Sequence, residues 1–286
     1  MTNNTKLCNC NGLFTNCSSL QSIPNDFMRY SKVGNFAHAF NGCSNLVGMI
    51  PSNLLLLSSG FITHLYNTFY NCSKITGFEN NVWNVTDFSN TLEMQNMFSG
   101  SGITNIPLVF CDNSTFTKLT RCESMFSRTK IVNIPNNFMN NCPLLTRCYD
   151  LFGGVTTLTS IPNGLFENCP KITLANAFFT NCSNLTGNIP VSFLRNSVLI
   201  TGSNFIFNNT KVTGIESGNI FERLTSASNL LDFKLMFFNC TNFTGSLPQF
   251  WILYPNVTST NKQNTFSNCY NSSNWYKVPI SWGGTL

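Results

Sequence analysis

Apolar residues recur along the chain with a long period that is set by one phenylalanine in each repeat. We call this residue the anchor phenylalanine, and it occurs at Phe14, Phe40, Phe69, Phe98, Phe126, Phe152, Phe179, Phe207, Phe237 and Phe266. Successive anchors are 26 to 30 residues apart. Such a period is typical of solenoids with one supersecondary unit per turn. The sequence therefore predicts one repeat domain over 1–286, with about ten 28-residue coils at about 14–270 and a candidate C-terminal cap at 271–286.

The segment after each anchor has the pattern of a short strand. It reads F-T-N-C-S-S-L-Q-S-I-P from Phe14 to Pro24. Its two apolar residues are expected to be buried. The proline that follows has no N–H to donate to a neighbouring strand, so it ends the strand. Equivalent apolar pairs are Leu20/Ile23, Ile103/Ile106, Ile131/Ile134 and Leu158/Ile161. Stacking of these strands predicts one parallel sheet.

The segment before each anchor has an apolar period of three or four, for example at Leu119, Cys122, Met125 and Phe126. This spacing predicts a short helix or 3₁₀ turn with one face inward. A second apolar corner follows the proline turn, at Phe110, Phe138, Phe166 and Phe221. The predicted fold class is an α/β or mainly-β solenoid, with a parallel sheet on one face and short helices or 3₁₀ turns on the other.

The repeat unit [MA]-F-x-N-C-S-x-L-x-x-I-P resembles the BspA-like leucine-rich repeats and the related M-F-x-x-C-x-x-L repeats of bacterial surface proteins. The resemblance covers nearly the whole chain, from about Phe14 to Cys269. It implies a right-handed solenoid that is used for adhesion to host proteins, other cells or matrix. The chain departs from the family in its longer period.

Composition supports a packed core and excludes several classes of protein. Hydrophobic residues make up 42% of the chain and charged residues only 9%, against a usual quarter. The net charge of +5 comes from singly scattered residues, so we expect no nucleic-acid partner. No apolar stretch reaches the 18 residues of a membrane span. The N-terminus lacks the regions of a signal peptide, and we expect an extracellular location, on a bacterial surface or a virion.

Thirteen cysteines raise the question of disulfides and metal sites. Six of them lie three residues after an anchor, where a small buried side chain fits: Cys17, Cys43, Cys72, Cys182, Cys240 and Cys269. The chain has no C-x-x-C pair with histidine partners, so we expect no metal and no cofactor. Stacking makes disulfides between adjacent coils conceivable, from Cys122 to Cys148 and from Cys142 to Cys169. The odd number of cysteines argues against complete pairing.

Stacking also turns repeat positions into columns on the surface, about 4.8 Å apart. We call one of them the threonine column, and its candidate binding residues are Thr76, Thr104, Thr159, Thr186, Thr213 and Thr244. Gln21, Val47 and Val132 share this repeat position but are not candidate binding residues. This flat, uncharged face fits the docking of a protein or glycan, or more remotely of ice. The alternative is that β-branched residues simply suit a parallel strand.

A second column carries charge five residues before the anchor. We call it the charged column, and its candidate binding residues are His64, Glu93, Arg121 and Arg147. It fits an acidic sugar or a charged loop of a partner. The alternative is a solvated ladder of ion pairs that contributes little to stability.

Catalysis is not expected. Polysaccharide-cleaving solenoids need two converging carboxyl groups, and the nearest pair is Glu123 with Asp150 on the predicted helical face. Glu79 and Glu216 share a repeat position but lie five coils apart. The chain contains no G-x-S-x-G and no phosphate loop, so an enzyme is a remote alternative and we assign no catalytic residue.

The sequence therefore predicts a non-enzymatic recognition or adhesion module that binds a host surface protein or glycan through the solenoid face. The alternative is a structural component of a virion or surface layer that packs against other subunits. The repeat pattern already begins at Lys6 to Phe14, which leaves almost nothing to protect the first coil. We expect this N-terminal edge to be covered by another subunit or by further residues.

Overall fold

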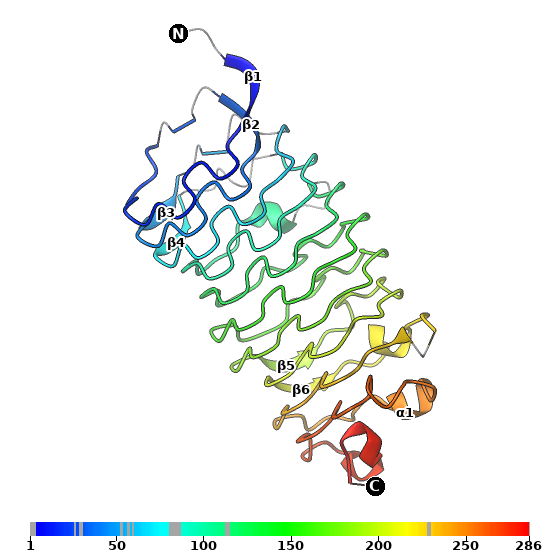
Figure 1. The fold of residues 1–286 in the computed structure, drawn as a ribbon. Helices are drawn as coiled ribbons and strands as arrows, with labels where there is room; N and C mark the ends of the chain where they lie inside the picture. Colours follow the sequence, from blue (N-terminus) through cyan, green and yellow to red (C-terminus); the bar gives the residue numbers. More distant parts are fainter. Residues whose placement is uncertain are drawn as a thin grey trace.

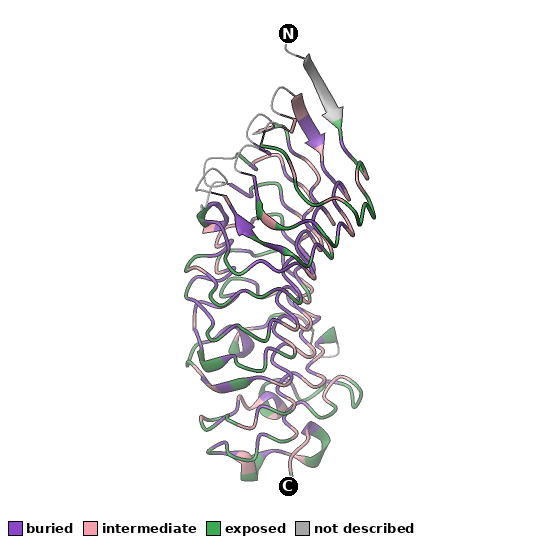
Figure 2. Cartoon of the chain, turned by 90° about the vertical axis from the view of Figure 1, so that its left-hand side faces the viewer, coloured by how far each residue is buried: buried purple, intermediate pink, exposed green. Residues whose placement is uncertain are grey.

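The structure is a computed structural model that describes residues 4–25, 27–28, 31–51, 54–55, 58, 60–79, 87–111, 115–227 and 230–285, with side chains from residue 9 onward. Its coils stack along one long axis, and the two ends of the chain lie at opposite ends of the stack (Figure 1). Buried residues recur in every coil along the stack (Figure 2). The chain is a repeat solenoid built mostly from short strands, turns and irregular segments.

The strands of the described residues pair in parallel, two at a time. They are β1 (Asn4–Asn9) with β2 (Ser31–Asn35), β3 (Gly48–Ile50) with β4 (Ile75–Phe78), and β5 (Thr186–Ile189) with β6 (Lys211–Ile215). Helical segments within the same residues are α1 (Phe250–Leu253) and the 3₁₀ turns η3 (Leu108–Cys111), η4 (Ile220–Glu222), η6 (Trp275–Lys277) and η7 (Ile280–Trp282). The expectation of one continuous sheet is therefore wrong.

Glycine explains part of this interruption. Gly48 and Gly187 begin or lie within strands and have positive φ angles of 88° and 81°. The register of the strand pair shifts beside each of them. Only glycine enters this conformation without a steric cost, so these positions bend the backbone out of a regular ladder. Three of the four apolar pairs are buried although no strand forms there, as at Ile103 and Ile131. Leu20 and Ile23 of the first coil are only half-buried.

The segments before the anchors are runs of β-turns, which corrects the prediction of short helices or 3₁₀ turns. In the second coil, the Ala39 N–H donates to the Phe36 carbonyl oxygen at 3.0 Å, and the Cys43 N–H donates to the Phe40 carbonyl oxygen at 3.1 Å. We call this stretch, from five residues before an anchor to three residues after it, the turn ribbon. Each ribbon stacks on the next coil, since the Phe36 N–H donates to the His64 carbonyl oxygen at 3.0 Å.

Left-handed residues are the reason why a helix does not form in the ribbon. His38 and Gly42 have φ angles of 56° and 74°, and each is the third residue of a turn. A left-handed residue ends a right-handed helix, and asparagine and glycine adopt this conformation most readily. The same two positions, four residues apart, are left-handed in later coils, at Asn67/Asn71, Asn96/Gly100, Ser124/Arg128, Asp150/Gly154 and Ala177/Asn181.

The anchor phenylalanines form one stacked column through the core. The ring centroids of successive anchors lie 5.4 to 5.9 Å apart with interplanar angles of 22° or less. The second apolar corner is also buried, and its rings meet the anchors edge-on, as Phe138 does with Phe126 at 5.9 Å and Phe152 at 5.7 Å. Offset and edge-on contacts are favourable for aromatic rings, so the two sets of rings bind each coil to the next.

Every cysteine whose side chain the structure describes is a free thiol. The thiols three residues after the anchors serve the stack directly, because Cys72 Sγ donates to the Phe40 carbonyl oxygen of the previous coil at 3.0 Å. The sequence allows disulfides between Cys122 and Cys148 and between Cys142 and Cys169. In the structure these four cysteines are buried free thiols. Burial raises the pKa of the Cys122 thiol well above its ordinary value.

Candidate functional site

Parallel backbone bridges hold the charged column in register. They join His64 to Glu93, Glu93 to Arg121 and Arg121 to Arg147. The same ladder includes Asn35, Leu174, Gly202 and Asp232 in neighbouring coils. The four candidate residues thus lie at the start of the turn ribbons, on bridged backbone and not on a helix. Stacking brings the side chains of His64, Glu93 and Arg121 together, and it places Arg147 on the next coil of the same ladder.

The Glu93 carboxylate lies between His64 and Arg121 in this column. His64 Nε2 lies 3.9 Å from Glu93 Oε2, and Arg121 Nη1 lies 3.8 Å from Glu93 Oε1. The side chains of His64, Glu93 and Arg121 are 33%, 27% and 37% exposed. Ion pairs this long and this exposed contribute little to stability. Their charged groups therefore remain accessible to a partner.

Arg121 also supports a buried carboxylate. Its Nε donates to Glu123 Oε1 at 2.9 Å, and Glu123 is only 2% exposed. The hydrogen bond to Glu123 raises the pKa of the Arg121 guanidinium. A buried carboxylate is strongly destabilising without its cation, so Arg121 is needed for the fold. Arg147, by contrast, is exposed.

Aromatic residues beside the charged column were missed by the sequence analysis. The rings of His38 and His64 both approach the ring of Tyr66 edge-on, with centroid distances of 5.3 and 6.1 Å. In a later coil, Tyr149 is 36% exposed and lies two residues after Arg147. Side chains two residues apart on an extended backbone lie on the same face. Tyr66 and Tyr149 each lie two residues after a residue of the charged column, so this alternation could have identified them.

The threonine column is exposed except at Thr213, which is half-buried. Threonine hydroxyls join the coils, since Thr76 Oγ1 donates to the Gly48 carbonyl oxygen and Thr104 Oγ1 to the Thr76 carbonyl oxygen, both at 3.3 Å. Backbone bonds from Thr186 to Thr159 and from Thr244 to Thr213 continue the stacking. The register is interrupted between β5 and β6, where Thr186 pairs with Lys211.

The carboxyl pair that could have supported catalysis is engaged elsewhere. Glu123 is paired with Arg121, and Asp150 Oδ2 accepts a hydrogen bond from Ser124 Oγ at 3.0 Å. Burial raises the pKa of Asp150. Among the residues whose structure is described, no three His, Cys, Asp or Glu side chains are grouped closely enough to hold a metal ion. Within those same residues, no helix has the length and hydropathy to cross a membrane.

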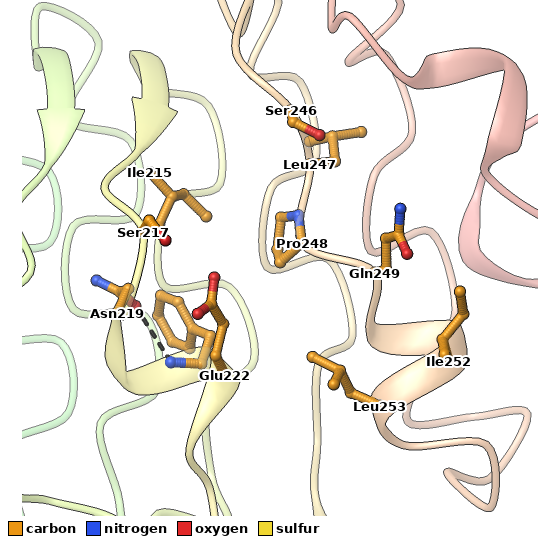
Figure 3. A pocket seen from close by; sticks show the side chains of 11 residues that line it. Ile215, Ser217, Asn219, Glu222, Ser246, Leu247, Pro248, Gln249, Ile252 and Leu253 are labelled. Carbon is orange, nitrogen blue, oxygen red and sulfur yellow. Dashed lines mark hydrogen bonds between the residues drawn. The ribbon is translucent and has the colours of Figure 1, made fainter.

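A groove that the sequence does not predict opens between two coils near the C-terminal end (Figure 3). It has a volume of about 610 Å³. Its lining residues come from two stretches, 215–222 and 246–253, and they are Ile215, Ser217, Asn219, Phe221, Glu222, Ser246, Leu247, Pro248, Gln249, Ile252 and Leu253. Neither the charged column nor the threonine column contributes to it.

Comparison with known proteins leaves the family of the chain open. No family model matches the chain, and no curated protein matches it. Among solved structures, it is similar to a leucine-rich repeat protein from Bacteroides ovatus, at 15% identity and a TM-score of 0.36. That match covers 88% of this chain and 69% of the other. A similarity this low carries no argument about function, which has to come from the residues themselves.

Proposed function

We propose that this chain is a non-enzymatic recognition module that binds a protein or glycan on a host or neighbouring cell, and that it acts outside the cell, on a bacterial surface or a virion. The observation that carries the proposal is the charged column. His64, Glu93, Arg121 and Arg147 are held in register by backbone bridges. Glu93 lies 3.9 Å from His64 and 3.8 Å from Arg121, and these three side chains are about one-third exposed. Accessible polar groups of both signs beside exposed Tyr149 suit recognition of a partner, although Arg121 also stabilises the fold through Glu123.

The test uses the exposed end of this column, because Arg147→Ala removes a charge without exposing the buried Glu123. Labelled protein is applied to a glycan array and to whole cells. Arg147→Ala is expected to lower binding at least about fivefold, which corresponds to the loss of one charge-assisted contact. Arg195→Ala is the control, because Arg195 is also exposed but pairs with Glu167 outside the column. Equal binding by both variants, or no ligand on either surface, would exclude this function.

A second function, as a structural subunit, is supported by the N-terminal edge. Leu13 in the first described coil is 46% exposed. The N–H groups of Cys10, Gly12 and Phe14 donate to the second coil. The other backbone edge of the first described coil therefore faces away from the stack. Such an edge readily pairs with another chain. Sedimentation of the purified chain tests this function: concentration-dependent association that Leu13→Lys abolishes supports it, and a monomer at all concentrations excludes it.

A further inference from the structure

The groove between residues 215–222 and 246–253 has the size of a binding site. Its volume of about 610 Å³ falls within the roughly 300–1,000 Å³ of ligand pockets. One wall carries η4 and the other carries α1 (Figure 3). This site lies outside the surface columns of the proposed function.

The groove follows a point where its two coils are bonded, since the Thr244 and Gly245 N–H groups donate to the Thr213 carbonyl oxygen at 3.0 and 2.9 Å. One coil earlier, β5 and β6 are paired, and the Glu216 N–H donates to the Ile189 carbonyl oxygen at 3.1 Å. On the opposite wall of the groove, the backbone of Leu247 is bonded to the following coil. Its N–H donates to Asn274 Oδ1 at 2.8 Å, and its carbonyl oxygen accepts from Asn274 Nδ2 at 3.0 Å. Asn274 thus holds this wall toward the following coil.

The lower part of the groove is held in place by buried groups. Phe221 is 1% exposed, and its carbonyl oxygen accepts a hydrogen bond from the Tyr254 hydroxyl at 2.9 Å. Asn219 is completely buried, and its side chain accepts from the Phe221 N–H at 3.1 Å and donates to the Pro190 carbonyl oxygen at 3.1 Å. The two walls are therefore fixed before any ligand binds, which lowers the entropic cost of binding.

The lining combines accessible apolar side chains with one carboxylate. Ile252 and Leu253 are 63% and 47% exposed, so they offer an apolar surface to a bound side chain. Glu222 is the charged residue among the lining set, and no lysine or arginine belongs to it. Its Oε2 accepts from the Gly218 N–H at 3.1 Å, which orients the carboxylate. The groove is complementary to a cation that is attached to an apolar body.

We propose that the groove binds a segment of another polypeptide through one lysine or arginine side chain and a neighbouring aliphatic side chain. The cation pairs with Glu222, and the aliphatic group packs on Ile252 and Leu253. The side chains of Ser217 and Gln249 lie along the groove and can hydrogen-bond to the peptide backbone of the bound segment. This is why the occupant is a peptide and not an isolated amine.

The test uses two probes that differ only in charge, acetyl-Leu-Lys-Leu-amide and its norleucine counterpart. Each is titrated into the full chain with labelled isoleucine and leucine methyl groups, and binding is followed by NMR. The lysine probe is expected to shift the methyl signals of Ile252 and Leu253 saturably. The norleucine probe should bind at least about fivefold more weakly, because it lacks the charge-assisted hydrogen bond.

Variants then assign the charge to Glu222. Glu222→Gln is expected to reduce the affinity of the lysine probe to that of the norleucine probe. Glu167→Gln is the matched control, because it removes the same charge outside the groove and should leave the affinity unchanged. If Glu222→Gln alters the fold, Ile252→Ser replaces it, because Ile252 is mostly exposed. Equal affinity for the two probes, shifts confined to residues outside the groove, or no saturation at about 5 mM would each overturn the proposal.

Discussion

At the scale of single residues, the position three residues after the anchor accounts for six of the thirteen cysteines. Cys72 and Cys182 each donate a thiol hydrogen bond to an anchor carbonyl oxygen of the previous coil. Where cysteine is absent, Thr129 and Thr210 occupy this position and donate to the carbonyl oxygen of their own anchor. Valine also occupies this position, at the buried Val155. The position therefore needs a small buried side chain, and cysteine satisfies this need without any redox chemistry.

Thiol reactivity should follow this assignment. Burial raises the pKa of Cys72 and of Cys182 to about 12, so little thiolate forms near neutral pH, and both thiols are shielded from reagents. Cys17 occupies the same repeat position but is exposed. Native protein treated with iodoacetamide at pH 8 is expected to be modified at Cys17 and not at the other two, as read by peptide mass spectrometry. In urea all three should react, and equal native rates would contradict the assignment.

Asp150 should make stability depend on pH in an unusual direction. Its pKa is raised by burial, which outweighs the hydrogen bond from Ser124. A carboxyl group with a higher pKa in the folded state binds its proton more tightly there, so the free energy of unfolding falls as the pH rises through that folded-state pKa. Asp150→Asn removes this loss. The variant should gain thermal stability relative to the native chain at pH 7.

The part of this gain that comes from the carboxylate should shrink as the pH falls from the folded-state pKa of Asp150 to the ordinary aspartate pKa of about 3.9. Below that value it should be absent, because both chains are then neutral at this position. Any constant difference reflects the preference of asparagine for the left-handed φ of 55° at this position. Thermal melts between pH 3 and 7 measure both contributions. A difference in melting temperature that does not change with pH would show that the carboxyl group is not destabilised by burial.

At the scale of elements, the sequence predicts the core and misassigns the turn ribbon. The apolar spacing before each anchor correctly marks Leu119, Cys122 and Met125 as buried. A spacing of three or four fits a helix and a run of turns equally well, however. The distinguishing signal is the pair of turn-forming residues four apart, as at Asn67 and Asn71. The groove could not be predicted, because it depends on which coil the side chain of Asn274 bonds to.

Two alanines in one ribbon test whether left-handed positions define this element. Ala177 has a φ of 55°, whereas Ala175 is fully buried and is not left-handed. Left-handed geometry strains an alanine by about 1–2 kcal/mol, so Ala177→Gly should stabilise the chain by about 0.5–1 kcal/mol after the entropy of glycine is counted. Ala175→Gly should destabilise it by about 1 kcal/mol. Urea denaturation gives both values, and two changes of the same sign would contradict the turn ribbon.

At the scale of the whole molecule, the two ends of the stack are unequal. Trp282 covers the last anchor: it is 3% exposed, its ring centroid lies 6.3 Å from that of Phe266, and its carbonyl oxygen accepts from the Phe266 N–H at 3.0 Å. In the first described coil, Leu13 is exposed. A solenoid is stabilised by contacts between neighbouring coils, so each end should respond separately to a change made there.

Trp282→Ala is therefore expected to open the C-terminal coils alone. Replacing a buried tryptophan by alanine costs roughly 3–5 kcal/mol, which is at least about a hundredfold in a local opening equilibrium. Amide hydrogen exchange should accelerate by that factor over 230–285 and remain unchanged around Phe126 and Phe152. Ile280→Ala in the same 3₁₀ turn is the control, since Ile280 is 71% exposed. Faster exchange in every coil would mean that the stack unfolds as one cooperative unit, and that the charged column cannot be separated energetically from the end of the chain.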